Sequence, residues 1–325
     1  MKINTFFILL ASLFMVSMVA SCATSTGQEG TAGRKLEPVV STNWLAENSH
    51  LKDLVIIDIR SPDAYGAGHI PGSINEPFVT AFDPCTGPTS NWIIGSKDCL
   101  WLQLPDAKDL MRTIGNLGIN ADSHVVIVTA PNPDEPPYFG LANATRVADT
   151  LIYAGVEHVA ILDGGYPKWA TEKRPTIKEV PDVSAVSYSG AVNKNMFVSM
   201  DYVQKRVGNA VIIDARNGIV YAGAVKEPFA DKPGHIPSAT SLPAPWIWNE
   251  NPNGTYAYKD SKTLGTMAAG VAGDPGSQEI IVYCGVGGYA SSWWFVLTQV
   301  LGYQNVKIYD GAAQEWVKHN DMVAD

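Results

Sequence analysis

An internal repeat constrains the fold of this chain more than any other feature. The stretch LVIIDIRSPDAYGAGHIPGSIN (Leu54–Asn75) recurs as AVIIDARNGIVYAGAVKEPFADKPGHIPSATSLP (Ala210–Pro243). Each copy has a β-branched run, an Asp-x-Arg turn and a Gly-His-Ile-Pro segment. Farther on, LIYAGVEHVAILDGGYPKWA (Leu151–Ala170) matches QVLGYQNVKIYDGAAQEWV (Gln299–Val317), with a strand that leads into Asp-Gly and a helix that bears tryptophan. The repeat predicts two similar halves.

Strand patterns alternate with helix patterns in both halves. This alternation predicts an α/β fold with a parallel sheet flanked by helices in each half. The segment from Pro181 to Lys194 lacks helical periodicity and is predicted to connect them. We therefore predict a first domain over 37–180, a linker over 181–194 and a second domain over 195–325.

The N-terminus has the features of an export signal. Lys2 precedes an uncharged apolar run from Phe6 to Ala20, which is too short to span a bilayer. The run ends in Val-Ala-Ser-Cys, which resembles a bacterial lipobox with Cys22 as the lipidated residue; the alternative is an ordinary signal peptide. We predict a signal peptide over 1–22, a flexible tether over 23–36 and an exported protein anchored by lipid to a membrane, the outer membrane if the host has two.

Composition excludes one class of partner. The chain has 46% hydrophobic and 17% charged residues and a net charge of −9, which is typical of a globular protein. It contains no basic cluster of the kind that binds nucleic acid. Nucleic acid is therefore not expected as a partner.

Export determines how the cysteines are interpreted. Cys85 and Cys99 lie in a segment rich in turn-forming residues, and an oxidising compartment favours a disulfide between them. Closing such a 15-residue loop would contribute about 3 kcal/mol in the chain-entropy model. Neither a CxxC motif nor a Cys/His cluster with zinc spacing is present, so no metal site is predicted. Cys284 is left as the unpaired thiol of the folded part.

Cys284 stands in EIIVYCGVGGYASSWWFVL, between an apolar run and a glycine-rich bend. Ile280–Tyr283 predicts a buried strand, and the apolar stretch Ser291–Val300 predicts a helix. Backbone N–H groups of the bend and the helix N-terminus would stabilise a thiolate, so we expect a lowered pKa and a nucleophilic sulfur. The alternative is a buried structural cysteine.

The corresponding loop of the first half has a different composition. In HVVIVTAPNPDEPPYFG, Ala130 is predicted to take the place of Cys284, and prolines replace the glycines. Each proline removes an N–H donor. The first half is therefore predicted to be a structural partner that covers one side of the pocket of the second.

Four motifs together resemble the rhodanese superfamily: Asp-Ala-Arg (214–216), Gly-His-Ile-Pro (234–237), the Cys284 loop and Tyr-Asp-Gly (309–311). The two-domain layout is similar to thiosulfate and 3-mercaptopyruvate sulfurtransferases. The resemblance implies that the Cys284 thiolate takes up a sulfane sulfur as a persulfide and passes it to a thiol or cyanide, with no cofactor. It implies an anion-binding loop formed by Gly285, Val286, Gly287, Gly288 and Tyr289. It also implies a supporting network of Asp214, Arg216 and His235, for which satisfying the loop backbone is the favoured interpretation.

The chain departs from the family pattern where substrate-binding arginines are expected. Those positions hold Val220-Tyr221 and Phe229, and Tyr289 and Val286 replace hydroxyl residues of the loop. We expect Val220, Tyr221, Phe229 and Tyr289 to line the pocket. Trp246 and Trp248 are further candidates, for which ordinary core or surface packing is the favoured interpretation. Losing two charge-assisted contacts of about 1.5–3 kcal/mol each would disfavour thiosulfate and mercaptopyruvate. The predicted donor is a polysulfide, a persulfide or a related selenium species.

Two other function classes are alternatives to the sulfurtransferase or sulfane-sulfur carrier. The first is a non-catalytic rhodanese-fold module that binds a protein partner in a cell-envelope complex; the missing arginines favour it, whereas the intact glycines favour the enzyme. The second is a phosphatase, which needs an arginine after the loop where this chain has Tyr289 and Ala290. The sulfurtransferase is the leading hypothesis.

Overall fold

The computed structural model describes residues 36–78, 85, 90–95, 98–131, 136–276 and 278–324. The predicted signal peptide with Cys22, and nearly all of the predicted tether, lie outside the described residues. Residues Leu36–Asp325 form one compact unit. Within the described ranges, no helix is both long and apolar enough to cross a bilayer.

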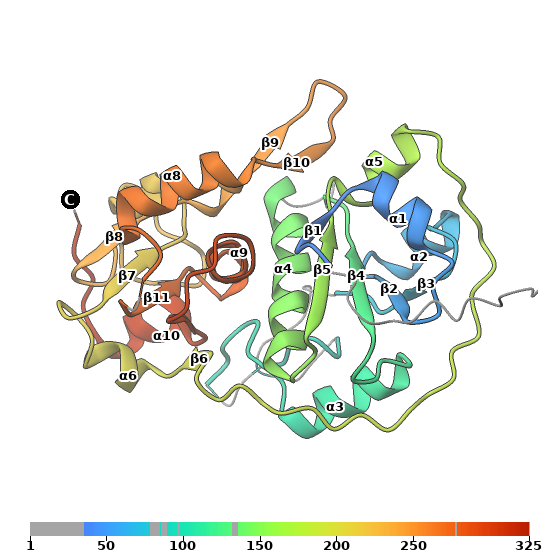
Figure 1. The fold of residues 1–325 in the computed structure, drawn as a ribbon. Coiled ribbons are helices and arrows are strands. Elements are labelled where there is room, and N and C mark those ends of the chain that lie inside the picture. Colours follow the sequence, from blue (N-terminus) through green and yellow to red (C-terminus); the bar gives the residue numbers. More distant parts are fainter. Residues whose placement is uncertain are drawn as a thin grey trace, which may run out of the picture. The chain divides into compact units, whose positions relative to one another are not determined.

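The first half is a parallel sheet covered by helices (Figure 1). Its described strands have the order β1-β5-β4-β2-β3, and every pair in it is parallel. The strands are β1 (Val39–Val40), β2 (Leu54–Asp58), β3 (Ser73–Asn75), β4 (His124–Val128) and β5 (His158–Leu162). The helices are α1 (Thr42–Asn48), α2 (Pro62–Ala67), α3 (Ala107–Asn116), α4 (Pro137–Tyr153) and α5 (Gly165–Thr171).

The second half repeats this arrangement. Its sheet has the order β6-β12-β11-β7-β8, again with parallel pairs. The strands are β6 (Phe197–Val198), β7 (Val211–Asp214), β8 (Ala239–Ser241), β11 (Ile280–Tyr283) and β12 (Val306–Tyr309). The helices are α6 (Met200–Gln204), α7 (Gly218–Tyr221), α8 (Ser261–Ala272), α9 (Gly288–Phe295) and α10 (Ala312–His319), with a 3-10 helix η1 (Ala244–Ile247) and a π-helix η2 (Val296–Val300). A hairpin of β9 (Trp248–Glu250) and β10 (Tyr256–Tyr258) is an addition to this half.

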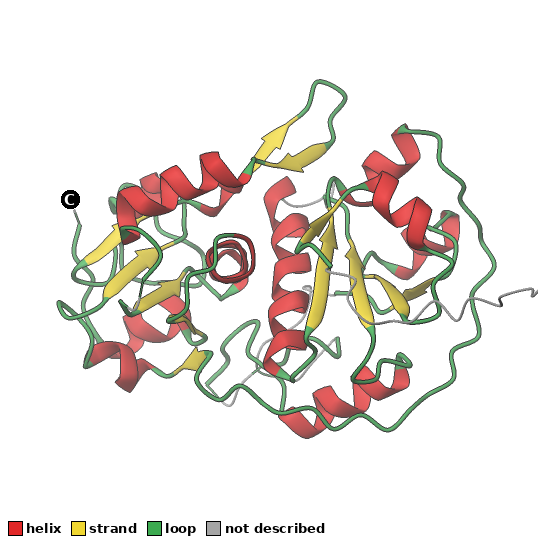
Figure 2. Cartoon of the chain, in the orientation of Figure 1, coloured by secondary structure: helices red, strands yellow, loops and turns green. Residues whose placement is uncertain are grey.

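Strands and helices alternate through both halves (Figure 2). The identical strand order confirms the predicted α/β class and the tandem arrangement. Residues 172–196 contain neither helix nor strand and include the predicted linker, 181–194. This segment is held against the first half, because Val186 N donates to Gly115 O at 2.9 Å and Asn193 N to Tyr153 O at 2.9 Å.

Strand register corrects one sequence prediction. The last residue of β4 lies opposite Asp58, and the last residue of β11 lies opposite Asp214. The next residue in the first half is Thr129, and in the second it is Cys284. The prediction that Ala130 takes the place of the cysteine is therefore wrong by one residue, because pairing with the neighbouring strand fixes the register.

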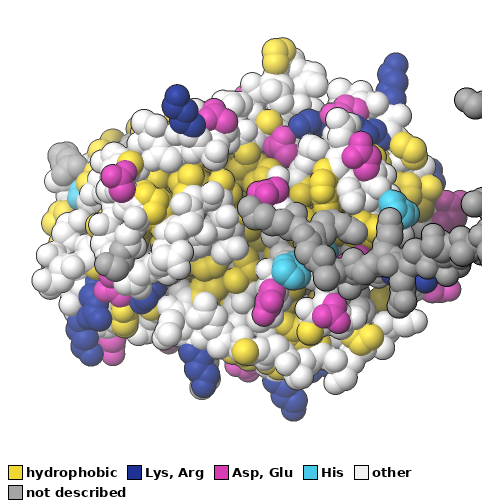
Figure 3. All heavy atoms as spheres, viewed as in Figure 1, with side chains coloured by type: hydrophobic (Ala, Val, Ile, Leu, Met, Phe, Trp, Pro, Cys, Tyr) yellow, Lys and Arg dark blue, Asp and Glu magenta, His cyan; other side chains and the backbone are white. Residues whose placement is uncertain are grey.

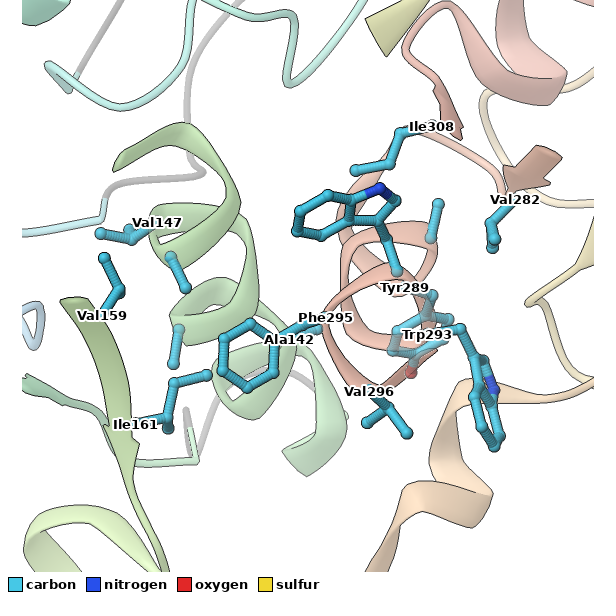
Figure 4. Packing of buried hydrophobic residues seen from close by; sticks show 14 of the residues in the cluster. Ala142, Val147, Val159, Ile161, Val282, Tyr289, Trp293, Phe295, Val296 and Ile308 are labelled. Carbon is cyan, nitrogen blue, oxygen red and sulfur yellow. The ribbon is translucent and has the colours of Figure 1, made fainter. Parts of the chain in front are cut away.

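The two halves share one hydrophobic core. Because successive side chains of a strand point to opposite faces, Val125 and Ile127 of β4 join the shared core, whereas Val126 packs with α1 and α5 on the other face. Helices α4 and α9 lie against each other in the shared core, where Phe295 points toward Ala142 (Figure 4). The first half is thus packed directly behind the helix that follows Cys284.

One face of the molecule shows how charge is distributed over this arrangement. Hydrophobic side chains gather along its middle, whereas most Lys and Arg side chains lie toward its edges (Figure 3). The described chain therefore does not present a continuous basic surface on that face.

Candidate active site

Cys284 lies directly after the central strand of the second sheet. Strand β11 pairs with β12 on one side and β7 on the other, so its apolar residues are buried on both faces. The carboxyl end of such a strand is where α/β folds place their ligand sites. Cys284 is 2% exposed, and it is the free cysteine of the described chain.

The loop after Cys284 bends back over the sulfur. Gly287 has φ +107°, a left-handed conformation that glycine adopts without strain, and it is the N-cap of α9. This turn brings the Gly287 N–H within 3.1 Å of Cys284 Sγ. From the other side, the start of α10 fixes the loop, since Ala313 N donates to Cys284 O at 2.9 Å and Gln314 N to Gly285 O at 3.1 Å. The loop thus leads from the strand into helix α9, as the sequence predicts, with the Gly287 N–H directed at the sulfur.

Gly285 is required because two side chains lie directly against it. A Cβ at this position would overlap the Phe229 ring and lie 2.6 Å from Glu227 Oε2. By contrast, a Cβ on Gly288 would meet nothing nearer than Leu102 Cδ1 at 3.9 Å. The glycine next to the cysteine thus permits close approach of the pocket wall.

The protonation state of Cys284 differs from the prediction. Burial raises the pKa of the Cys284 thiol above its ordinary value, and the nearby Glu227 charge acts in the same direction. Backbone N–H groups of Ala290, Val286 and Gly287 lower this pKa but do not outweigh burial. The predicted lowered pKa is therefore wrong for the free protein, because the sequence pattern shows the N–H donors but not the depth of the sulfur.

Cys284 opens into a cavity of about 410 Å³. Both halves contribute to its wall, which confirms that the first half covers one side of the pocket. The first half supplies Trp101, Leu102, Phe139, Ala142 and Asn143. The second supplies Glu227, Pro228, Phe229, Cys284, Gly285, Val286, Gly288 and Tyr289. The described lining is apolar and aromatic, with Glu227 as its one charged side chain.

The predicted pocket residues divide into two groups. Phe229 and Tyr289 line the cavity as expected. Val220 is buried in α7, and Tyr221 donates to Ala239 O at 2.9 Å and stacks on His235, with ring centroids 3.8 Å apart. Val220 and Tyr221 are therefore not among the cavity-lining residues, because the short helix α7 turns their side chains into the fold of the second half.

The two tryptophans named with them lie elsewhere as well. Trp246 is 53% exposed, and Trp248 is buried in the hairpin beside Tyr138 and Tyr258. Neither lines the Cys284 cavity. Trp248 packs between the hairpin and the first half, whereas Trp246 is a largely exposed residue of η1.

One wall of the cavity is a segment of the first half that is fastened to the second. Gln314 Oε1 accepts from Trp101 N at 2.9 Å, and its Nε2 donates to Trp101 O at 3.0 Å. Asp310 Oδ2 accepts from Leu104 N at 2.9 Å. The predicted disulfide is present in the structure and joins Cys99, two residues before Trp101, to Cys85.

Arg146 of α4 completes this attachment. Its side chain is fully buried, and Nη2 donates to Leu102 O and to Asp310 Oδ1, both at 2.7 Å. Its Nη1 would lie 3.5 Å from a Cβ on Gly287. A cation of the first half therefore lies beneath the cysteine loop and the Asp-Gly turn. No motif in α4 points to this role, so it could not be predicted from the sequence.

The supporting residues form a closed network beside the site. Arg216 donates from Nε to both oxygens of Asp214, at 2.9 and 3.1 Å, and from Nη2 to Asp214 Oδ2 at 2.5 Å and to Gly234 O at 2.7 Å. His235 Nδ1 lies 2.9 Å from Tyr221 O. These groups satisfy one another and the loop backbone, which agrees with the structural interpretation of the three residues.

Glu227 is the pocket residue that sequence analysis missed. Burial raises the pKa of Glu227 to about 7, Arg216 opposes this rise, and Asp214 adds to it. Its Oε2 lies 3.5 Å from Arg216 Nη1. Glu227 and Pro228 directly precede Phe229 in the sequence, and the family pattern points only to Phe229 as a substrate-binding position.

The described residues hold no group of three or more His, Cys, Asp or Glu side chains that could bind a metal ion. The described groups available for chemistry at this site are one buried thiol and the N–H groups over it, beside an apolar pocket that can hold an organic molecule.

These features define a tandem α/β protein with one cysteine site between its halves. A model of the rhodanese-like domain matches residues 41–172 and again residues 199–319. The chain belongs to the rhodanese family, as its motifs predicted.

Similar proteins agree with this assignment. A protein of Synechococcus elongatus named "Putative thiosulfate sulfurtransferase" is 29% identical over 290 residues, which cover 86% of this chain and 83% of that protein. One of Mycolicibacterium smegmatis with the same name is 27% identical over 296 residues, 88% of this chain and 95% of that protein. The crystal structure of SseA from Escherichia coli, described under "3-mercaptopyruvate sulfotransferases", matches with a TM-score of 0.65 and 27% identity, over 85% of this chain and 98% of that chain. The predicted resemblance to both sulfurtransferase groups is confirmed.

Proposed function

We propose that this protein is a sulfurtransferase that carries a sulfane sulfur on Cys284. The observation that carries the proposal is the position of the sulfur, at the wall of the cavity and 3.1 Å from the Gly287 N–H. The family and the names of its relatives support the same reaction class.

The proposed reaction has two displacement steps. The Cys284 thiolate attacks the terminal sulfur of a donor R–S–SH, the donor S–S bond breaks, and R–S⁻ leaves with its electron pair. An acceptor nucleophile, a thiolate or cyanide, then attacks the outer sulfur of the Cys284 persulfide. The second S–S bond breaks and the Cys284 thiolate is restored, so no external oxidant or reductant is consumed.

The loop N–H groups explain how a buried thiol can react. The raised pKa of Cys284 leaves little thiolate in the resting protein at neutral pH. The same depth, however, makes fixed dipoles more effective, because little water screens them. The N–H groups of Val286, Gly287 and Ala290 are oriented before reaction and stabilise negative charge on either sulfur as it develops.

The pocket favours a sulfur donor other than thiosulfate, the anion after which the relatives are named. None of the described side chains that line the cavity is a Lys or Arg, and Glu227 adds negative charge. Thiosulfate would enter as a dianion with no cationic side chain on the described cavity wall, which is costly in an apolar site. The arginine beneath the loop, Arg146, is already paired with Asp310. We propose a persulfide, a polysulfide or a related selenium species as the donor.

The proposed setting is the cell envelope, with Cys22 as a lipid anchor that follows a signal peptide. This rests on the lipobox-like Val-Ala-Ser-Cys sequence and on the Cys85–Cys99 disulfide, which is typical of exported proteins. Replacing Cys22 with Ala should release the protein or leave its precursor uncleaved. Mature, membrane-bound Cys22→Ala protein would contradict the anchor.

Mass spectrometry of the intact protein tests the chemistry. After exposure to a low-molecular-weight persulfide or to polysulfide, the wild type should gain about one sulfur atom, and Cys284→Ser should gain none. The added mass should disappear on incubation with a thiol or cyanide. If no donor adds mass to the wild type, the non-catalytic module that binds an envelope partner should replace the enzyme as the proposed function.

A further inference from the structure

The charge arrangement around Glu227 indicates what kind of molecule fills the cavity. Glu227 lies on the cavity wall beside Gly285, and its side chain is 19% exposed. Of the described lining residues it alone is charged. Aromatic rings occupy much of the remaining wall, namely those of Trp101, Phe139, Phe229 and Tyr289.

The neighbouring arginine does not neutralise this carboxylate. Arg216 makes contacts of 2.5–3.1 Å with Asp214, but its closest contact to Glu227 is 3.5 Å. One guanidinium thus faces two carboxylates, which leaves a net charge of −1 when both are ionised. The other titratable groups that face Glu227 are Cys284 and Tyr289, and both are neutral at pH 7, because burial raises the pKa of each.

We infer that the sulfur donor or acceptor of this site is an organic cation, such as a thiol or persulfide that bears an ammonium group. A positive group next to Glu227 would neutralise the net charge of −1 on Asp214, Arg216 and Glu227. Aromatic faces attract cations through their quadrupoles, most strongly in desolvated sites. An anionic substrate would instead add a second uncompensated negative charge to a buried pocket.

This inference rests on the proposed function for its reaction but not for its binding. A cation in the cavity would also offset the Glu227 charge that opposes thiolate formation at Cys284. Substrate entry and activation of the nucleophile would then be linked through one carboxylate.

The first experiment compares three acceptor thiols on persulfide-loaded wild-type protein. Cysteamine is cationic, 2-mercaptoethanol is neutral and 3-mercaptopropionate is anionic, while their reacting sulfur is similar. Single-turnover rates, corrected for the thiolate fraction of each acceptor, should be highest for cysteamine by about fivefold or more and lowest for 3-mercaptopropionate. Equal rates, or a preference for the anion, would overturn the inference.

The variant Glu227→Gln should remove the preference for cysteamine, so that the ratio of the cysteamine rate to the 2-mercaptoethanol rate falls to about one. The ratio is the readout because Glu227 also acts on Cys284 and can change both rates together. Glu157→Gln, which removes an exposed carboxylate outside the described cavity lining, is the matched control and should keep the preference. A cysteamine preference that persists in Glu227→Gln would contradict the role of this residue.

The preference should also depend on pH with a defined sign. With the pKa of Glu227 raised to about 7, its carboxyl is protonated below that pH and ionised above it. The ratio of the cysteamine rate to the 2-mercaptoethanol rate should therefore rise as pH increases through about 7. Glu227→Gln should show a flat ratio over the same range.

A binding experiment separates this inference from the proposed chemistry. Calorimetric titration of Cys284→Ser with benzyltrimethylammonium and with phenylmethanesulfonate needs no persulfide. The cation should bind at least tenfold more tightly than the sulfonate, and Glu227→Gln should reduce this difference. If the wild type forms no persulfide but the cation still binds, the proposed function fails alone. If the sulfonate binds as well as the cation, the inference fails whatever Cys284 does.

Discussion

The two halves of this protein share their framework and differ at one loop. Both have the same strand order, and in both an arginine makes a two-pronged contact with an aspartate two residues before it. A histidine stacked on a tyrosine follows in each half, as Tyr65 with His69 and Tyr221 with His235. The first half has this network without a cysteine, so the network supports the fold. Reactivity therefore depends on the residues beside the network that differ between the two halves.

Around the site, the two halves differ at a few positions. Where the second half has Cys284, the first has Thr129, whose hydroxyl donates to Gly140 O at 2.7 Å. The second half also has Tyr283, which donates to Asp214 Oδ2 at 2.7 Å and accepts from Ile236 N at 3.0 Å. The first half instead provides the opposite wall of the cavity. One copy of the fold therefore carries the nucleophile and the other shapes its surroundings.

The largest predicted effect comes from moving the cysteine between the halves. In a Cys284→Ser background, Thr129→Cys should restore a buried thiol but no detectable persulfide. Pro131, the second residue after Thr129, has no N–H, and Thr129 is not among the residues that line the Cys284 cavity. Intact mass after persulfide treatment measures this. A gain of one sulfur in the double variant would show that the framework alone suffices.

The next effect concerns stability and should be nearly equal in the two halves. Arg60→Gln and Arg216→Gln each leave a buried aspartate without its partner, which typically costs about 3–5 kcal/mol. Denaturant unfolding should show similar losses for the two variants. Only Arg216→Gln should change the pocket, because Arg216 holds down the pKa of Glu227. A loss confined to Arg216→Gln would mean that the two networks are not equivalent.

The third prediction tests the wall that the first half contributes. Cys85→Ser with Cys99→Ser should lower the free energy of unfolding by about 3 kcal/mol in the chain-entropy model. The disulfide lies next to the segment that carries Trp101 and Leu102, so the rate of persulfide formation should fall as well, by a smaller factor. Thermal unfolding and loading rates of the double variant measure both, with untreated and reduced wild type as controls. Two free thiols in non-reducing peptide mapping of the exported protein would refute the disulfide.

The parts of the fold and site that could be predicted from the sequence are those that depend on local interactions. The repeat, the parallel sheets and the Cys284 bend depend on periodicity and glycine pattern, which can be recognised along the chain. Arg146 and Glu227 could not be found in this way, since their roles arise from contacts with residues 164 positions away, Asp310, or on another loop, Arg216. The shift in the pKa of Cys284 was predicted in the wrong direction for the same reason, because the burial that raises this pKa is a property of the folded core.

The same limit explains the misplaced pocket residues. Val220 and Tyr221 were expected in the cavity because the family carries an Arg-aromatic pair there, but α7 turns both side chains into the second half, where the Tyr221 hydroxyl donates to Ala239 O. Val220 is 7% exposed and packs inside the second half. A resemblance thus transfers backbone position more safely than side-chain direction.

The smallest predicted effect is found at the turn that holds the cysteine loop. Gly165 has φ +56°, and its counterpart Ala312 has φ +58°. Ala313 N donates to Cys284 O, as Tyr166 N does to Thr129 O, both at 2.9 Å. The same turn is therefore built with glycine in one half and with a left-handed alanine in the other.

Replacing each residue with that of the other half should give opposite results. A Cβ at Gly165 would overlap the Thr129 carbonyl, so Gly165→Ala should cost about 1–3 kcal/mol or more. Ala312→Gly should relieve a left-handed conformation that costs about 1–2 kcal/mol. This gain is offset by about 0.5–1 kcal/mol of added chain freedom and about 0.8 kcal/mol from the lost buried methyl group. Unfolding curves should therefore show a clear loss for Gly165→Ala and a change within about 1 kcal/mol for Ala312→Gly. A large loss for Ala312→Gly would mean that the alanine methyl group, rather than the turn, positions the loop of Cys284, and the two halves would differ in their framework as well as in their loop.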